Sequence, residues 1–335
     1  LDTPVGGTPP DRASVNHAKS TALYGQFTYT PAILDDRLHL TGGLRYTKDK
    51  KRGQLTALRG VPQSLAYRFI SSRVDPSASI SFDASNATQF YVRWGVAYRA
   101  GGANSRSATF RTFGEEEVRS WEIGMKTEFW NRKGRFNIAA FDMDYRDVQT
   151  DFPNPANPSN VETMNANGTI KVKGIEIDAA LRPIPGLTLD ASYSYLHNRM
   201  PLTLNPFVGE PVTTFLTFAP KHSASGAIDY RFNETSLGTP FLHLDGNYAT
   251  GSYSLPGQPY KTDSYFTSNG RIGLDEIPLG KGAGSLRAAF WMKNIFNEEH
   301  KVFRNIASSG AGTTNAIWDF YNLPRTYGFE LSYRY

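Results

Sequence analysis

The chain ends in a stretch that alternates strictly between apolar and polar side chains. The apolar positions are Tyr327, Phe329, Leu331, Tyr333 and Tyr335. The positions between them are Gly328, Glu330, Ser332 and Arg334. A period of two is typical of a β-strand with one apolar and one polar face. Whatever fold the chain adopts must therefore cover or immerse one whole side of such strands.

The same alternation recurs along the whole chain, which predicts roughly thirteen strands near the 9–11 residues that a tilted strand needs to cross a bilayer. The expected strands cover residues 23–29, 38–46, 74–82, 89–99, 121–129, 139–145, 175–181, 187–195, 224–231, 242–248, 266–275, 286–293 and 325–335. In the sixth, we assign Ala139, Phe141, Met143 and Tyr145 to the apolar face and Asp142 and Asp144 to the polar face. In the seventh, a change of parity near Gly174 predicts a β-bulge.

The connections between these strands alternate between tight and long. The tight ones are residues 30–36, 83–87, 130–134, 182–186, 232–238 and 276–284. The long ones are residues 48–67, 99–117, 147–168, 197–221, 252–263 and 301–324. Membrane β-barrels have this asymmetry, with short turns on the periplasmic side and long loops outside.

Charge and aromatic placement favour a bilayer as the medium that meets the apolar faces. Those faces carry almost no charge, and a charge facing lipid at mid-bilayer costs about 2–4 kcal/mol. Tyrosines stand at several strand ends before long connections, where an amphipathic ring suits the membrane–water boundary. The mean hydropathy of −0.44 does not exclude a barrel, because only every second residue of its strands is apolar. The predicted fold is all-β, a transmembrane antiparallel β-barrel.

An odd number of strands has a consequence for the chain ends. A bacterial single-chain barrel has an even strand count, so we expect strands to be missing at the amino end, unless one lies unrecognised within residues 48–72. Residues 1–16 are expected to be an extracellular loop remnant, and residues 17–335 the barrel domain. The chain starts with no basic and apolar leader segment, so export requires something upstream.

Several motifs, in order and from about residue 21 to the end, resemble the barrel of TonB-dependent outer-membrane receptors of the siderophore-receptor type. They are GGLRY at 42–46, YRAGGAN at 98–104, EVRSWEIGMKTEF at 117–129, FDMDYRDVQ at 141–149, KGIEI at 173–177, APK at 219–221, KNIFN at 293–297 and PRTYG at 324–328. The resemblance implies the carboxy-terminal part of a barrel of about 22 strands in the bacterial outer membrane. The family's amino-terminal plug has no counterpart in this sequence.

The resemblance also implies function and partners. These are energy-coupled uptake of a ferric siderophore or similar metal chelate, powered by the TonB–ExbB–ExbD complex acting through the plug. Passive porin-like conduction is an alternative, and a soluble β-sandwich that binds or adheres is another, since its apolar faces would form a dry interior. The net charge of +5 is spread among interleaved acids and bases, which does not favour nucleic-acid binding.

Candidate site residues follow from the chemistry of a polar, often anionic chelate, which suits arginine and aromatic side chains. The candidates in the long connections are Arg99, Arg106, Phe110, Arg111, Trp318, Phe320 and Tyr321. The charges expected to face the lumen and contact the plug are Arg45, Arg93, Glu122, Arg271, Arg287 and Lys293. The six histidines are widely scattered, so no metal site is predicted, and no catalytic constellation or cofactor motif is recognised.

Overall fold

The computed structural model describes residues 12–58, 60–105, 107, 109–154, 157–280, 284–309 and 314–335. None of these residues forms a helix long and apolar enough to cross a bilayer. The described chain consists of antiparallel strands joined by turns and extended connections. Thirteen strands make one continuous sheet, as the alternation predicts.

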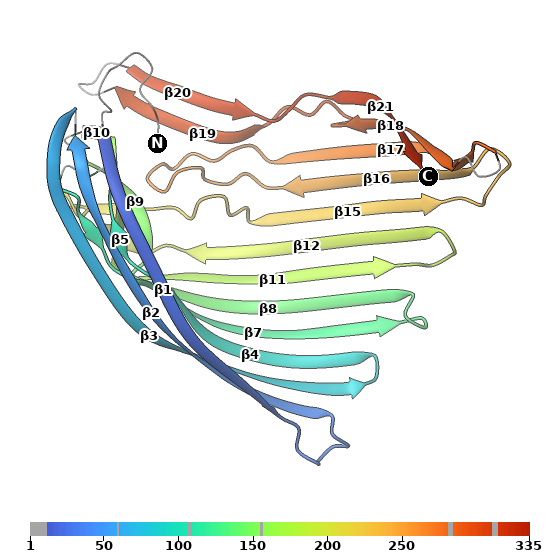
Figure 1. Cartoon of the computed structure of the whole chain (residues 1–335), viewed down its shortest axis with the longest axis horizontal. Coiled ribbons are helices and arrows are strands. Elements are labelled where there is room, and N and C mark those ends of the chain that lie inside the picture. Colours follow the sequence, from blue (N-terminus) through green and yellow to red (C-terminus); the bar gives the residue numbers. More distant parts are fainter. Residues whose placement is uncertain are drawn as a thin grey trace.

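The strands of the main sheet lie side by side in the order of the sequence. Each one pairs with the next strand along the chain that is part of this sheet. Its strands are β1 (Arg12–Tyr29), β2 (Leu38–Leu58), β3 (Val61–Ser85), β4 (Thr88–Arg99), β7 (Glu116–Phe129), β8 (Gly134–Arg146), β11 (Thr169–Leu181), β12 (Leu187–Arg199), β15 (His222–Arg231), β16 (Thr239–Ala249), β17 (Tyr265–Pro278), β18 (Ser285–Lys293) and β21 (Thr326–Arg334). Figure 1 shows them as one strongly curved wall, with the tight turns and the carboxy terminus at one end and the long connections at the other.

Four of the long connections carry small two-stranded sheets. They are formed by β5 (Gly102–Ala103) with β6 (Thr112–Phe113), β9 (Gln149–Asn154) with β10 (Asn157–Asn165), β13 (Leu202–Leu204) with β14 (Pro211–Thr213), and β19 (Lys301–Ser309) with β20 (Thr314–Tyr321). Most of the buried apolar side chains of the described residues lie at this end too. Phe110, Phe152, Ile170 and Val172 are at most 6% exposed.

The apolar stripes lie on one face of the wall and are open. Cross-strand partners share a face of a sheet, and the pairs Trp94↔Trp121 and Phe290↔Phe329 put these rings side by side. Trp121 is 57% exposed and Phe329 is 86% exposed. A β-sandwich would bury these side chains, so the open apolar face fits the hydrocarbon of a bilayer. We call this the outer face and the opposite one the inner face.

Two expected features of the amino-terminal third are wrong. Residues 48–67 do not form a long loop, because β2 and β3 stay paired from Lys48↔Ser72 to Leu58↔Val61. The described residues of this range form no strand of the main sheet besides β2 and β3. The expected loop remnant at residues 1–16 overlaps β1, which already begins at Arg12; residues 1–11 lie outside the described part. The prediction failed because β1, β2 and β3 extend beyond the bilayer, where their outer face needs no apolar side chains. The apolar–polar alternation is lost there, although the backbone pairing continues.

The face assignment of β8 is also wrong. Phe141 pairs with Glu122, and Asp142 pairs with Trp121. Ala139, Phe141, Met143 and Tyr145 therefore lie on the inner face, and Asp142 and Asp144 lie on the outer one.

The predicted bulge at Gly174 is absent, because β11 keeps an unbroken register with β8 and with β12. The apolar side chains Ile170 and Val172 point inward, whereas Ile175 and Ile177 point outward. The change of parity has a different origin. Near the long connections, the inner face is itself apolar and covered by them.

Candidate functional site

A cavity of about 750 Å³ opens on the inner face at the end of the long connections. We call it the vestibule. Its apolar wall comes from three neighbouring strands and consists of Phe141, Met143, Tyr145, Ile170, Val172 and Leu196. Its polar rim consists of Arg99, Glu116, Gln149, Thr150, Asp151 and Thr163. Ligand sites typically combine mostly apolar walls with a few fixed polar groups in a volume of about 300–1,000 Å³.

The rim is built around the carboxylate of Glu116, which is only 14% exposed. Arg99 Nη2 donates to Glu116 Oε2 at 2.6 Å, and the backbone N–H of Gln149 donates to the same oxygen at 2.8 Å. Arg99 also donates to the carbonyl oxygen of Gln149 at 3.3 Å. These bonds fix the guanidinium while its side chain stays 59% exposed. Arg99 can thus present a positioned positive charge to a ligand in the vestibule.

Tyr145 adds a neutral hydroxyl to the wall. Its O–H points to Met143 Sδ at 3.6 Å. The hydroxyl can donate or accept a hydrogen bond.

The other candidates of the 99–117 connection have different surroundings. Phe110 is 3% exposed, and its ring packs edge-on against Tyr67 with centroids 5.2 Å apart. It therefore holds the connection together rather than facing a ligand. Arg111 lies with Nε 3.9 Å from Glu162 Oε2 and its guanidinium 5.0 Å from the ring centroid of Phe207. Arg106 lies outside the described residues.

The aromatic candidates of the last long connection stand on β20. Trp318, Phe320 and Tyr321 are 58%, 59% and 49% exposed. Phe320 packs edge-on against Phe303 at 5.7 Å, and Tyr321 lies 5.7 Å from the ammonium of Lys301. In the described part of the chain they do not line the vestibule, so the two groups of candidates are not brought together.

The six predicted inner-face charges all have inward parity in the register of the sheet. Arg93 and Glu122, for example, pair with each other directly beside the outward pair Trp94↔Trp121. Three of them, Arg271, Arg287 and Lys293, line one cavity of about 540 Å³ near the carboxy terminus. Arg271 pairs with Glu330 at 3.0 Å, and the guanidinium of Arg287 lies 4.4 Å from the ring centroid of Phe241. That any of the six contacts a plug remains a prediction.

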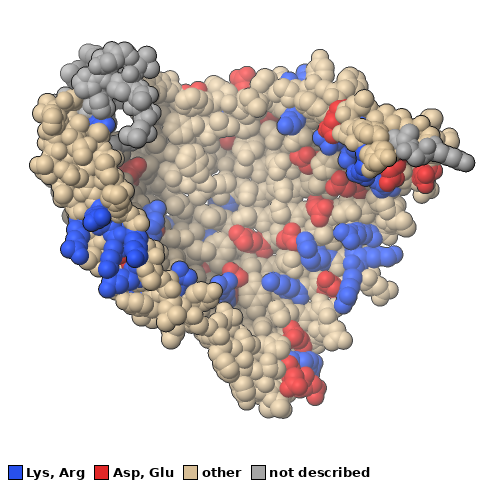
Figure 2. Space-filling view, in the orientation of Figure 1, with Lys and Arg blue, Asp and Glu red and all other residues tan. Residues whose placement is uncertain are grey.

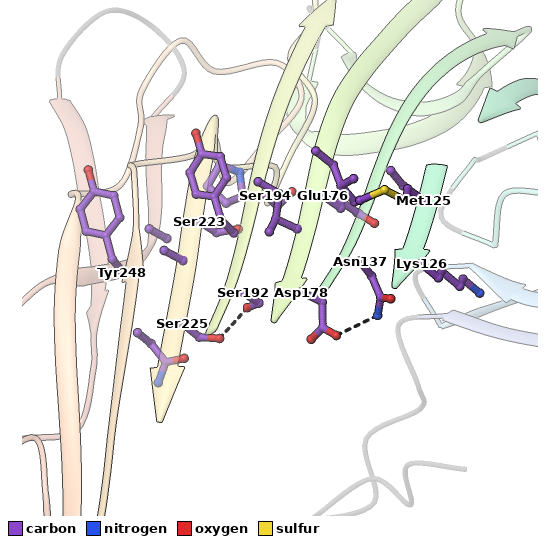
Figure 3. Close-up of a pocket in the computed structure, with 18 of the residues that line it drawn as sticks. Met125, Lys126, Asn137, Glu176, Asp178, Ser192, Ser194, Ser223, Ser225 and Tyr248 are labelled. Carbon is purple, nitrogen blue, oxygen red and sulfur yellow. Dashed lines mark hydrogen bonds between the residues drawn. The ribbon is translucent and has the colours of Figure 1, made fainter. Parts of the chain in front are cut away.

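A second polar surface lies in the middle of the inner face, in a cavity of about 590 Å³. Figure 3 shows four serines on two adjacent strands, with Asp178 and Asn137 on the strands beside them. The hydroxyls of Ser192 and Ser225 are 2.7 Å apart, and Asn137 Nδ2 donates to Asp178 Oδ1 at 3.2 Å. Hydroxyl, amide and charged groups of this kind, which include Lys126, Glu176 and Asp178, suit contact with another polar surface or with water.

Residues 1–295 match the family described as TonB dependent receptor-like, beta-barrel. The chain belongs to this family. The pesticin receptor of Yersinia pestis is 20% identical over 298 residues, which cover 88% of this chain and 41% of that protein. The ferrichrome outer membrane transporter/phage receptor of Escherichia coli (strain K12) is 28% identical over 133 residues, which cover 40% of this chain and 17% of that protein.

Solved receptor structures show the same fold. The ferric yersiniabactin uptake receptor FyuA from Yersinia pestis superposes with a TM-score of 0.76 at 19% identity, over 95% of this chain and 46% of that one. The siderophore receptor PiuA from Acinetobacter baumannii superposes with a TM-score of 0.73 at 15% identity, over 94% of this chain and 43% of that one. The chain thus spans less than half the length of these relatives.

The family places the sheet of this TonB-dependent receptor barrel in the bacterial outer membrane. Long connections lie outside the cell and tight turns in the periplasm, so the vestibule faces the exterior. Arg99, a predicted candidate, lies at the rim of the vestibule, and its role in binding remains a prediction. The sequence analysis missed the vestibule wall, because it assigns Phe141, Met143 and Tyr145 to the lipid-facing side. The sequence contained a signal for the correct assignment. Lys171 and Lys173 share the parity of the lipid-facing Ile175, so acidic residues such as Asp142 and Asp144 are needed on the same face to pair with them.

A buried histidine lies at the base of the β19–β20 hairpin, outside the membrane. The His300 ring is 4% exposed and stacks on Tyr265 with centroids 4.0 Å apart and planes within 9°. Its Nδ1 has no hydrogen-bond partner in the described part of the chain. Burial lowers the pKa of the imidazole from its ordinary value of 6.5, although the charges of Glu298 and Asp263 oppose the shift.

We therefore expect the hairpin to loosen in mild acid. An opened state, with the ring in water, binds a proton more readily than the packed state, so packing is favoured above pH about 6.5 and weakens as the pH falls below it. Amide hydrogen exchange of β19 and β20 should accelerate between pH 7.5 and 5.5, after correction for the intrinsic exchange rate. His300→Phe, which keeps a stacked ring without a titratable group, should remove the acceleration; an unchanged pH response in that variant would assign the effect to another group.

Proposed function

We propose that this barrel belongs to an active-transport receptor that takes up a ferric siderophore or a similar metal chelate across the outer membrane. The observation that carries the proposal is the vestibule, which opens outward, has an aromatic and aliphatic wall, and has a fixed but exposed arginine at its rim. An anionic chelate with an organic scaffold would match both parts. The ferrichrome transporter of Escherichia coli and the ferric yersiniabactin uptake receptor of Yersinia pestis, which are among the relatives, support this class of ligand.

We further propose that transport is powered by the TonB–ExbB–ExbD complex, acting on a plug domain within the barrel. The charged and hydroxyl-lined inner face supports this, because a polar surface can hold a folded domain through hydrogen bonds and yet release it. Arg93, Glu122 and Arg271 are the side chains we expect to contact the plug.

The experiment is a binding measurement on the protein purified from outer membranes. Ferric hydroxamate, catecholate and phenolate chelates, each with its iron-free form, are titrated while intrinsic tryptophan fluorescence is followed. We expect saturable binding of one ferric class, and uptake of radioactive iron in that form should depend on TonB. Steady single-channel conductance with no saturable binding would instead identify a passive pore.

A further inference from the structure

The extracellular ends of β1, β2 and β3 carry a dense group of basic side chains on the outer face. Figure 2 shows Lys and Arg gathered over this part of the wall. The register places Lys19 opposite Lys50 and Arg52 opposite Arg68. We call the group the basic patch; its members, all exposed, are Lys19, Lys48, Lys50, Arg52 and Arg68.

No acid offsets this charge from the same face. The outward positions of β1 from Ala13 to Thr21, of β2 from Lys48 to Thr56 and of β3 from Pro62 to Ser72 include no Asp or Glu. Asp49 has inward parity, and its carboxylate accepts a hydrogen bond from the Tyr98 hydroxyl. Within the described part of the chain, no side chain of the basic patch has an ion-pair partner.

Other lysines of the main sheet, on β2 and β11, do have partners. Lys51, on the inner face, donates to the carbonyl oxygens of Ala100 and Gly101 at 3.3 and 2.8 Å. On the outer face of β11, Lys173 pairs with Asp142 at 2.8 Å, and Lys171 lies 3.7 Å from Asp144. The sheet therefore neutralises cations just beyond its apolar band on β11 and leaves them unneutralised on β1–β3.

The position of the basic patch relative to the bilayer follows from the outward apolar residues of β2 that precede it. The outward apolar residues of β2 run from Leu38 to Tyr46, a nine-residue span that fits the length needed to cross the hydrocarbon layer. Lys48 is the next outward residue, and Lys50 follows. Long basic side chains at such positions reach into the headgroup layer.

We propose that the basic patch binds the phosphate groups of lipids in the outer leaflet. Like charges directly opposite one another weaken strand pairing, so Lys19 against Lys50 and Arg52 against Arg68 call for an anionic partner. The patch continues the lipid-facing stripe without a break, which favours a lipid headgroup over a soluble anion or a protein. Arg52 and Arg68 supply planar donors that suit phosphate oxygens.

The test uses the protein purified from outer membranes and placed in phosphatidylcholine nanodiscs doped with bis-phosphorylated lipid A. Retained lipid A is quantified by mass spectrometry. In the variant K19Q/K48Q/K50Q/R52Q, retained lipid A should fall about fivefold or more, since each basic residue near an anionic surface adds to binding. Dephosphorylated lipid A should be retained poorly by both proteins.

Matched controls separate the basic patch from charge in general and from misfolding. K171Q/K173Q removes two cations from the outer face of the same wall that already have acidic partners, and it should leave retention unchanged. K19R/K48R/K50R keeps the charge and should retain lipid A like the parent. Heat-dependent gel migration establishes that each variant is folded. Equal retention by the parent and the quadruple glutamine variant would overturn the proposal, as would displacement of the lipid by millimolar inorganic phosphate, which would indicate a site for a free anion.

Discussion

Arginine at Ile138 should prevent or severely weaken barrel assembly, whereas arginine at Phe141, three residues along the same strand, should not. Ile138 has outward parity, paired with Met125 and Ile177 in the middle of the apolar band. A charge there faces lipid and costs about 2–4 kcal/mol. Phe141 has inward parity in the vestibule wall, where water can solvate a charge. The measurement is the midpoint of urea unfolding in liposomes, together with heat-dependent gel migration.

This pair of variants decides the face of β8 directly. The alternation of β8 in isolation predicts the reverse result, with Phe141 against lipid and Asp142 inside. If Phe141→Arg were the more damaging variant, the inward assignment of the vestibule wall would be wrong. The Phe141 ring packs tightly against Gly174, where even an added Cβ would meet it. Phe141→Leu therefore serves as the control for the effect of losing the ring from this contact.

The alternation of a single strand was sufficient to assign its inner and outer faces wherever each face has one environment along its whole length. In β7, lipid requires Trp121 and Ile123 to be apolar while the lumen accepts Glu122, so alternation and register agree. In β8, the outer face leaves the bilayer at Asp142, and the inner face is covered by loops at Phe141. Both faces change character at the same height, and one strand read alone cannot reveal this. The pairing of Asp142 with Lys173 contains the missing information, but it belongs to two strands.

The candidate site shows a similar division. Arg99 was predicted because an arginine at a strand end before a long loop is a sensible partner for an anion. Phe110 was predicted as an aromatic group of the same long loop, yet it is buried against Tyr67. Tyr67 lies about forty residues earlier in the chain, on a stretch expected to be a loop. Loop residues depend on distant packing partners, and sequence spacing does not specify these.

Replacing Arg99 by alanine should weaken binding of the ferric chelate at least tenfold, which corresponds to about 1.4 kcal/mol. The loss has two sources. The exposed guanidinium no longer pairs with the anionic ligand, and the Glu116 carboxylate loses the hydrogen bond from Arg99 while it keeps the one from the Gln149 N–H. R99A combined with R111A should add little, because the Arg111 side chain already lies beside Glu162 and Phe207. Tryptophan fluorescence titration with the ferric chelate measures each affinity.

The double variant R99A/E116Q separates the two sources. If repulsion by an uncompensated Glu116 contributes, the double variant should bind more tightly than R99A alone while remaining weaker than the parent. Arg135→Ala is the matched control, since Arg135 is a similarly exposed inner-face arginine that pairs with Asp178 at 3.1 Å near the periplasmic end, far along the strand from the vestibule. Unchanged affinity in R99A, or an equal loss in Arg135→Ala, would remove Arg99 from the binding site. Because Arg99 is fixed by its own hydrogen bonds before any ligand arrives, it loses little conformational freedom on binding, and this is why a single rim arginine should have so large an effect.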